Sequence, residues 1–539
     1  MTQPRLKHFG WGREGEGLAP AEEAFVVVRA EQRFGRLAAP EVKPPHLDDI
    51  KLEPPRLNPP ASLPFCSTER YDRVAHTYGK SFPDYARGFA GDYGSAPDVV
   101  AYPRTEEEVV ATLDWAAGAQ ASVTPFGGGS SVVGGVEPHR DASRYKAAVT
   151  IDLRAMGRVL EVDETSRAAH IEAGAFGPAL EAQLKPHGLT LRHFPQSFEC
   201  STLGGWIATR SGGHFATLYT HIDEFVESLR VITPKGILET RRLPGSGAGP
   251  SPDRLLIGSE GILGIITQAW MRLQHRPRFR AGSAMHFADF FTAAKALRAI
   301  SQAGLYPANC RILDPQEALN TGAADGSVAI MVLAFESGDH PVEPWLARAR
   351  ECCADYGGKP DRADRAEAHR EGAAGAWRNA FIRMPYAREL MVQRAIIDDT
   401  FESAITWERF EAFHDNIKAA TERAIKDATG LAGQVTCRCT HAYPDGPAPY
   451  FTFHAAGRHG ELIAQWQTIK SAALDAVIAN GGTITHHHAV GRDHRRWYDR
   501  QRPPLFAAAL KAAKATMDPQ GLLNPGVLID PWPEIRSAT

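Results

Sequence analysis

The chain has 539 residues, of which 43% are hydrophobic and 23% charged, and 60 lysines and arginines nearly balance 63 aspartates and glutamates to give a formal net charge of -3. These proportions are typical of globular domains, and at roughly 100 to 200 residues per domain the length predicts two to four of them. They exclude a disordered chain and a disulfide-rich miniprotein, and the near-neutral charge gives no general electrostatic reason to expect a nucleic-acid partner.

The cysteines and the amino terminus bear on location. Seven cysteines, an odd number without the paired spacing of a zinc knuckle, indicate free thiols in a reducing compartment. The amino terminus lacks the apolar core of a secretion signal, and the longest strongly apolar run, residues 328–335, is too short to span a bilayer. We therefore expect a cytoplasmic protein that contacts membranes at most peripherally.

The first half of the chain predicts an extended segment followed by a mixed domain. Residues 1 to about 70 are rich in proline and charge, so we expect 1–94 to run as an extended segment over the surface. From Val99 the pattern changes, and Thr105 with Glu108 forms a capping box that opens a helix to about Gly118. Further strands are predicted at 122–126, 148–153, 170–172, 226–233 and 262–273, which together indicate an α+β domain over 95–277.

The second half contains the same order of elements twice. The first series has strands at 283–287, 308–313 and 328–335 and helices at 290–303 and 344–356; the second has helices at 408–429 and 462–479 and strands at 435–442, 450–454 and 483–487. Each series resembles a split βαβ unit, so 278–500 is predicted to form one broad antiparallel sheet backed by helices. A helix is expected at 361–377. Residues 501–539 are expected to return to the first domain as a helix, a turn and a short terminal strand.

The strongest local signal is the segment PFGGGSS at 125–131, directly after a predicted strand. Three glycines and two hydroxyl groups let successive backbone amides converge on a concave surface, which suits an anionic pyrophosphate. The spacing is neither GxGxxG nor a Walker loop, so a Rossmann site is disfavoured. Taken alone, the segment is equally compatible with a plain turn.

Two further segments, STLGGW at 201–206 and IGSEGILGII at 257–266, give the glycine loop its significance. In this order and at these separations, the three segments resemble the FAD-binding domain of the vanillyl-alcohol oxidase flavoprotein superfamily. The resemblance implies FAD as cofactor, with the first loop at the pyrophosphate, the middle segment along the flavin and the third at the adenine and ribose side. It also implies an FAD-binding domain over 95–277 with an antiparallel-sheet cap domain over 278–500.

The resemblance assigns cofactor contacts residue by residue. They are Pro125, Gly127, Gly128, Gly129, Ser130, Ser131, Pro195, Ser197, Ser201, Thr202, Gly204, Gly205, Glu260, Gly261, Gly264, Ile265 and Ile266. Superfamily members that attach FAD covalently often do so through a histidine in or near the first loop. Because no histidine lies between Pro125 and Val136, we expect FAD to be bound noncovalently.

A histidine triplet lies in the segment THHHAVG at 485–491, which follows NGG at 480–482. On a strand, His486 and His488 would share one face and His487 the other. Two histidines on one face can form a metal pair, but no third ligand at metal spacing is visible nearby, so no metal is predicted. Upstream, Tyr450 is either an amphipathic aromatic on a sheet or a functional residue.

These second-half segments resemble the alkyl-dihydroxyacetone-phosphate synthase family of ether-lipid assembly, from about residue 95 to the end. The resemblance implies Tyr450 as the catalytic tyrosine, His193 near the flavin, and Arg311 and Arg383 as functional arginines. It also implies that His486, His487 and His488 orient groups or shuttle protons, and it extends to residues 401–403, Phe-Glu-Ser. Two departures are Gln196, where an acidic residue is usual, and Arg492, where a lysine is usual; a peroxisomal signal of the usual spacing is also missing near the amino terminus.

The family reaction replaces the acyl chain of acyl-dihydroxyacetone phosphate by a long-chain alcohol without net oxidation. Tyr450, with an ordinary pKa of about 10, can be the base only if arginine or protonated histidine neighbours lower that pKa. Arg311 and Arg383 would clamp phosphate or carboxylate. We expect a small-molecule or lipid phosphate as substrate; a homodimer is compatible with the sequence.

Two alternatives stay open. An FAD-dependent 2-hydroxy-acid dehydrogenase would use an arginine for the substrate carboxylate and a histidine for the hydroxyl proton. The other alternative is a protein that binds flavin or lipid without catalysing a reaction. In that case the titratable residues described above would be together by coincidence.

Overall fold

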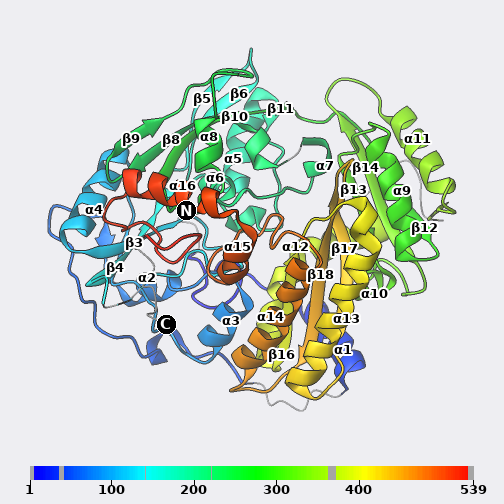
Figure 1. Cartoon of the computed structure of the whole chain (residues 1–539), viewed down its shortest axis with the longest axis horizontal. Coiled ribbons are helices and arrows are strands. Elements are labelled where there is room, and N and C mark those ends of the chain that lie inside the picture. Colours follow the sequence, from blue (N-terminus) through cyan, green and yellow to red (C-terminus); the bar gives the residue numbers. More distant parts are fainter. Residues whose placement is uncertain are drawn as a thin grey trace.

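The computed structural model describes residues 5–35, 42–139, 141, 143–219, 221–361 and 372–531. Two lobes lie side by side, each around its own sheets (Figure 1). Buried hydrophobic side chains form one large core in each lobe. The predicted α+β class, with an FAD-type domain and a helix-backed antiparallel cap, is confirmed.

The first lobe contains two main sheets. A four-stranded sheet has the order β1-β2-β4-β3, with β1 (Cys66–Ser67), β2 (Val99–Ala101), β4 (Ala147–Asp152) and β3 (Ala121–Phe126). A five-stranded antiparallel sheet has the order β5-β6-β10-β8-β9, with β5 (Val159–Asp163), β6 (Ala168–Glu172), β10 (Ile265–Arg272), β8 (Val226–Thr233) and β9 (Gly236–Glu239). β7 (Leu189–Thr190) pairs with β11 (Gln274–His275). Helices α4 (Glu106–Gly118), α5 (Gly177–Leu184), α6 (Leu203–Thr209), α7 (Ala216–Tyr219) and α8 (Pro252–Leu256) complete the lobe.

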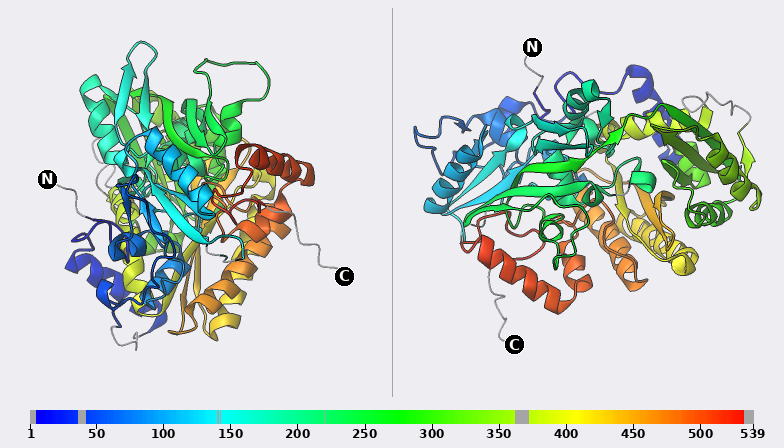
Figure 2. Two further views of the ribbon diagram at one scale, coloured as in Figure 1. Left: turned by 90° about the vertical axis from the view of Figure 1, so that its left-hand side faces the viewer. Right: turned by 90° about the horizontal axis from the view of Figure 1, so that it is seen from above.

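The predicted N-cap of α4 is present, since the Thr105 hydroxyl accepts a hydrogen bond from the Glu108 amide at 3.3 Å. β2 and β3 both run parallel to β4, with Val123 opposite Val149. The glycine loop therefore follows the carboxyl end of β3 at Phe126, and it lines a cavity together with residues of the second lobe. Figure 2 shows the two lobes from two further sides.

The second lobe is built on one seven-stranded antiparallel sheet. Its order is β15-β12-β14-β13-β17-β18-β16, with β15 (Lys359–Pro360), β12 (Phe279–Phe287), β14 (Ala329–Ser337), β13 (Asn309–Leu313), β17 (Gln434–Ala442), β18 (Pro447–Ala456) and β16 (Ile396–Glu402). The helices are α9 (Phe290–Gln302), α10 (Pro315–Asn320), α11 (Glu343–Ala354), α12 (Gly372–Gln393), α13 (Phe410–Thr429), α14 (Leu462–Ala479) and α15 (Arg495–Gln501). The series β12, α9, β13, β14, α11 and the series β16, α13, β17, β18, α14 share this sheet, as the predicted pair of split βαβ units requires.

The two faces of this sheet differ in chemistry because side chains alternate along each strand. Cys310 and Ile312 point into the hydrophobic core, whereas Arg311 between them points to the opposite face. In the same way, Phe451 points into the hydrophobic core and its neighbour Tyr450 points to the cavity. The side chains that the sheet presents to the cavity between the lobes are Arg311, Asp398, Thr400, Arg438, Thr440, Tyr450, Thr452 and His454. The apolar face packs into the hydrophobic core, and the polar face lines the cavity.

The amino-terminal segment differs from its prediction. Residues Pro20–Phe34 form the 15-residue helix α1, and α2 (Arg70–Ala75) and α3 (Phe82–Phe89) follow. The prolines that predicted an extended segment lie between residues 44 and 64, whereas α1 contains proline only at its first position, where a missing amide hydrogen has no cost. α1 packs against α12 and lines the cavity.

Three further expectations need correction. The edge strand is β16, not residues 483–487, which are irregular and bent. The carboxyl-terminal segment has the helix α16 (Pro504–Met517) but no terminal strand among the described residues; instead Leu523 makes a single bridge to Val123. The helix expected at 361–377 begins at Gly372 in the described residues, and 362–371 lie outside them. No helix in the described part of the chain combines the length and apolarity needed to cross a bilayer.

Candidate active site

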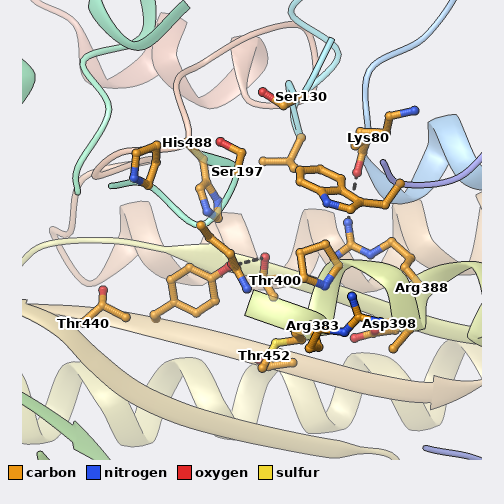
Figure 3. A pocket seen from close by; sticks show the side chains of 18 of the residues that line it. Lys80, Ser130, Ser197, Arg383, Arg388, Asp398, Thr400, Thr440, Thr452 and His488 are labelled. Atoms are coloured by element: carbon orange, nitrogen blue, oxygen red, sulfur yellow. Dashed lines mark hydrogen bonds between the residues drawn. The ribbon is translucent and has the colours of Figure 1, made fainter. Parts of the chain in front are cut away.

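A cavity of about 760 Å³ lies between the lobes. Its walls come from the glycine loop, from residues 195–214, from the polar face of the seven-stranded sheet, and from α1 and α12. Figure 3 shows Ser130 and Ser197 facing the sheet residues Thr400 and Thr452 across this space. The described residues that line it include seven arginines and lysines (Arg29, Arg33, Lys80, Arg311, Arg383, Arg388 and Arg438) against three carboxylates (Glu22, Glu317 and Asp398). The excess of positive charge suits an anionic ligand.

The glycine loop lies against residues 200–202 so closely that side chains are excluded. A Cβ atom on Gly128 would lie 1.8 Å from the carbonyl oxygen of Cys200, and one on Gly127 would lie 2.2 Å from the Thr202 hydroxyl oxygen. Gly129 adopts a left-handed φ of 67°. This packing leaves backbone amides at the cavity wall, as close approach to a pyrophosphate requires. The residues present therefore fit FAD.

The structure brings many of the predicted cofactor residues to the cavity. Those that line it are Gly127, Gly128, Gly129, Ser130, Ser131, Pro195, Ser197, Ser201, Thr202 and Gly205. Pro125, Gly204, Glu260, Gly261, Gly264, Ile265 and Ile266 lie outside its lining. The third segment packs behind the loop, where Pro125 contacts the backbone of Gly261, and Ile265 and Ile266 lie in the core of β10.

Glu260, predicted as a cofactor contact, lies outside the cavity lining and binds two backbone amides of another segment. Its two carboxylate oxygens accept hydrogen bonds from the amides of Val490 and Gly491, each at 2.8 Å. Burial raises the pKa of Glu260 to about 7, although the two amides oppose that shift. This residue thus joins the first lobe to the segment that carries the histidine triplet.

The histidine triplet surrounds a buried carboxylate. Glu402 at the end of β16 is 1% exposed and accepts amide hydrogen bonds from His486 at 2.5 Å, His487 at 3.1 Å and His488 at 2.9 Å. The Thr485 hydroxyl donates a fourth at 2.7 Å. The expected strand alternation is therefore wrong, because three consecutive amides converge on one carboxylate in a turn. His487 and His488 line the cavity, whereas His486 lies outside its lining.

We expect Glu402→Gln to destabilise this turn. The amide group of glutamine would place a donor against donors and remove the charge, which costs roughly 1–3 kcal/mol or more for a buried group. The midpoint of thermal unfolding should fall by several degrees. The exposed Glu461→Gln, which removes a carboxylate 53% exposed, should leave that midpoint unchanged. An equal midpoint for both variants would contradict this role of Glu402.

Tyr450 lies on β18 between charged and aromatic neighbours. Its hydroxyl donates to the Thr400 hydroxyl at 3.0 Å, and the Arg438 guanidinium carbon lies 4.0 Å from its ring centre. The ring centres of His487 and His488 lie 6.0 and 5.3 Å away. Burial raises the pKa of Tyr450 despite the opposing arginines, so the pKa is not lowered as a base was expected to require. Tyr450 is a neutral phenol in the resting site.

The two predicted arginines differ in their surroundings. Arg311 is 2% exposed, donates to the carbonyl of His214 at 3.3 Å, and has a pKa lowered to about 9 by burial and by the nearby Arg438. An anion in the cavity would relieve both effects. Arg383 lines the cavity from α12, but its Nε and Nη2 donate to Glu22 at 2.9 Å each. The α1 carboxylate therefore occupies the fork that was expected to clamp substrate.

His193 is fully buried beside the cavity rather than in its lining. Its Nε2 lies 2.7 Å from the hydroxyl of Ser211, which does line the cavity, and burial lowers its pKa to about 3. Its ring packs against Trp206 of the middle segment. Neutral His193 thus supports the wall next to the expected flavin.

Sequence reasoning missed several residues that the fold brings to this site. Lys80, Arg388, Arg438, His441 and His214 line the cavity, and Tyr443 lies behind the histidine triplet. The alternation of polar and apolar residues along 435–442 was a signal for Arg438 and His441, whereas Lys80 comes from a segment with no pattern that points to it. Glu402 was noticed only as part of a matching segment.

Three histidines here are close enough to be tested as metal ligands. Ring nitrogens of His441, His486 and His487 lie within 4.8 Å of one another. However, the Nδ1 atoms of His486 and His487 are hydrogen-bonded at 2.9 Å, so one of them carries a proton. In this arrangement that protonated nitrogen has no lone pair to offer a metal ion.

Comparisons with known proteins agree with the geometry. The family models for an FAD binding domain and for the C-terminal domain of FAD linked oxidases match residues 97–241 and 276–528. The alkyldihydroxyacetonephosphate synthase of Dictyostelium discoideum is 31% identical over 525 residues, covering 90% of this chain and 83% of that protein. A solved alkyldihydroxyacetonephosphate synthase superposes with a TM-score of 0.80 at 26% identity, covering 96% of this chain and 98% of that one. A glycolate oxidase subunit of Bacillus subtilis is 26% identical over 450 residues, covering 82% of this chain and 91% of that protein.

The glycine loop, the two lobes and both family models define an FAD-dependent enzyme, and FAD is its cofactor. Within that class, the extent of the match to the Dictyostelium protein is decisive. The chain belongs to the alkyldihydroxyacetonephosphate synthase family.

Proposed function

We propose that the enzyme exchanges the acyl chain of acyl-dihydroxyacetone phosphate for a long-chain alcohol. The observation that carries this proposal is one cavity with two kinds of wall. Arg311, Tyr450, His487 and His488 lie on its polar side, near the glycine loop. On its apolar side it is lined by Leu18, Ala21, Phe25, Val26, Ala30, Met384, Pro385, Ala387 and Met391 from α1, α12 and the adjoining chain. A phosphate head and a long chain need these two environments together.

Each polar residue has a distinct task in this proposal. Arg311 binds the phosphate, and the bound anion offsets the burial of its guanidinium. FAD, when bound, would supply an electrophile for the substrate carbon that loses the acyl group and gains the alcohol. Tyr450 begins as a neutral phenol, and the Arg438 guanidinium over its ring stabilises the phenolate that forms when its proton passes to one of the neighbouring histidines. His487 and His488 lie beside that ring and are neutral, because burial lowers the pKa of each.

The test is an exchange assay with acyl-dihydroxyacetone phosphate and a labelled long-chain alcohol. We expect labelled ether product and free fatty acid in equal amounts, without consumption of an electron acceptor. Fatty acid released without ether would indicate a hydrolase and would contradict the proposal.

Arg311→Lys should impair exchange severely. Lysine keeps the charge but loses the planar fork that binds phosphate in two places. We expect KM for the phosphate substrate to rise by about tenfold or more, as loss of a charge-assisted hydrogen bond worth about 1.5–3 kcal/mol predicts. Arg278→Lys in the basic stretch before β12 is a matched control. Equal KM values for both variants would remove Arg311 from the phosphate site.

FAD is proposed to be bound without a covalent link. Acid or heat precipitation should then leave the yellow colour in the supernatant, where absorbance can be measured. Colour that stays with the pelleted protein would show a covalent bond and overturn this part of the proposal. A cytoplasmic location, peripheral membrane contact and a homodimer remain predictions from the sequence.

A further inference from the structure

A continuous chain of hydrogen bonds leads from the cavity into the first lobe. His487 Nδ1 is 2.9 Å from His486 Nδ1, and His486 Nε2 is 2.8 Å from the hydroxyl oxygen of Tyr443. The same hydroxyl is hydrogen-bonded to Nε2 of His221. Tyr443 directly follows β17 in the second lobe, whereas His221 belongs to the first lobe, so the chain crosses between them.

A contact of His221, at the end of the chain away from the cavity, determines which atom donates in each of these hydrogen bonds. Burial lowers the pKa of His221, and a hydrogen bond between its ring and the backbone of Arg210 opposes that shift, as a carbonyl acceptor does. A neutral His221 that donates there through Nδ1 must accept from Tyr443 at Nε2. Tyr443 then accepts from His486 Nε2, and His486 Nδ1 accepts from His487 Nδ1. The Nε2 atom of His487 is thereby left as a lone pair on a residue that lines the cavity.

We propose that His487, His486, Tyr443 and His221 form a proton relay that removes the proton released by the exchange. This inference rests on the proposed function. In that reaction an ester C–O bond breaks, an ether C–O bond forms, the acyl group leaves as a carboxylate, and the alcohol loses one proton. His487 Nε2 takes up a proton and each later group passes one on, so that the charge emerges on His221. No oxidant or reductant is needed.

The surroundings suit this direction of transfer. Burial holds the pKa of His486 and of His487 well below the ordinary value, so charge does not rest on the inner rings. Burial lowers the pKa of His221 as well, but the Asp223 carboxylate and the Arg210 backbone oppose that shift, so charge is favoured at the outer end over the inner rings. Asp223, itself buried, pairs with Arg210, whose side chain is 60% exposed, so the relay ends beside an ion pair that reaches the surface. His441, whose Nε2 contacts the Gly213 carbonyl at 3.1 Å, lies beside the relay and outside it.

The first test reads tautomers by nitrogen NMR of histidine-labelled enzyme without substrate. We expect the proton on Nδ1 of His221, Nε2 of His486 and Nδ1 of His487. The opposite tautomers would overturn the relay as a proton acceptor, and stoichiometric zinc bound to His486 and His487 would overturn it altogether. The NMR measurement needs no turnover. A failed exchange assay alone would therefore count against the proposed function and not against this chain of hydrogen bonds.

The second test is Tyr443→Phe, which keeps the ring and removes the linking hydroxyl. We expect FAD to be retained, kcat for exchange to fall by about tenfold or more, and the solvent deuterium isotope effect on kcat to rise, with KM little changed. Tyr145→Phe, which removes a buried hydroxyl bonded to the Gly521 carbonyl in the first lobe, is the control. Equal isotope effects in wild type, Tyr443→Phe and Tyr145→Phe would overturn the relay.

Discussion

Tyr450→Phe is expected to fold and to bind FAD, yet to lose exchange activity by about a hundred to ten thousand fold. Phenylalanine keeps the ring that packs near His487 and His488 and removes the group that carries the proton. The hydroxyl also donates to Thr400, so one buried hydrogen bond is lost with it. The loss should therefore appear mainly in kcat, measured with saturating substrates and an unchanged flavin content.

Tyr85→Phe is the matched control for that variant, because Tyr85 is also a buried tyrosine that lines the cavity. It should retain exchange within a few fold of wild type. If Tyr450→Phe matched Tyr85→Phe in kcat, Tyr450 would be a wall residue and the chemistry would have to be assigned elsewhere.

Gly128→Leu is expected to abolish FAD binding and with it all activity. A Cβ atom at this position would lie 1.8 Å from the Cys200 carbonyl oxygen, so the loop would have to leave residues 200–202. The purified variant should be colourless, with no flavin absorbance after removal of unbound FAD. Gly118→Leu, at the end of α4 where no heavy atom lies within 4 Å, should stay yellow. A yellow Gly128→Leu protein would show that this loop does not hold the cofactor.

The second lobe was predictable because its pattern is regular. Strands such as 308–313 and 435–442 alternate between polar and apolar residues, and the flanking helices carry apolar residues at helical spacing. The strand β16 was missed because IIDDTFE breaks the alternation with two adjacent aspartates. In the fold Asp399 pairs with Lys470 and Arg388, and Asp398 lies beside His454. Such long-range ion pairs are not visible in a local pattern.

The residue types of the candidate site could be predicted from the sequence, but their hydrogen bonds and ion pairs could not. The histidine triplet and Tyr450 were found from their motifs, but the turn around Glu402 depends on a carboxylate more than 80 residues away. In the same way, the pairing of Arg383 with Glu22 joins segments 361 residues apart. Only the three-dimensional fold shows which charges are already neutralised.

The central claim is a redox-neutral exchange on an FAD enzyme, and the flavin spectrum tests it most directly. Anaerobic enzyme should keep its oxidised flavin absorbance with lactate-like 2-hydroxy acids, and should form labelled ether when given acyl-dihydroxyacetone phosphate and a labelled long-chain alcohol. A dehydrogenase would instead bleach under 2-hydroxy acids, with the histidines mattering more than Tyr450. Sustained bleaching by such acids without any ether product would contradict the account while leaving the fold intact.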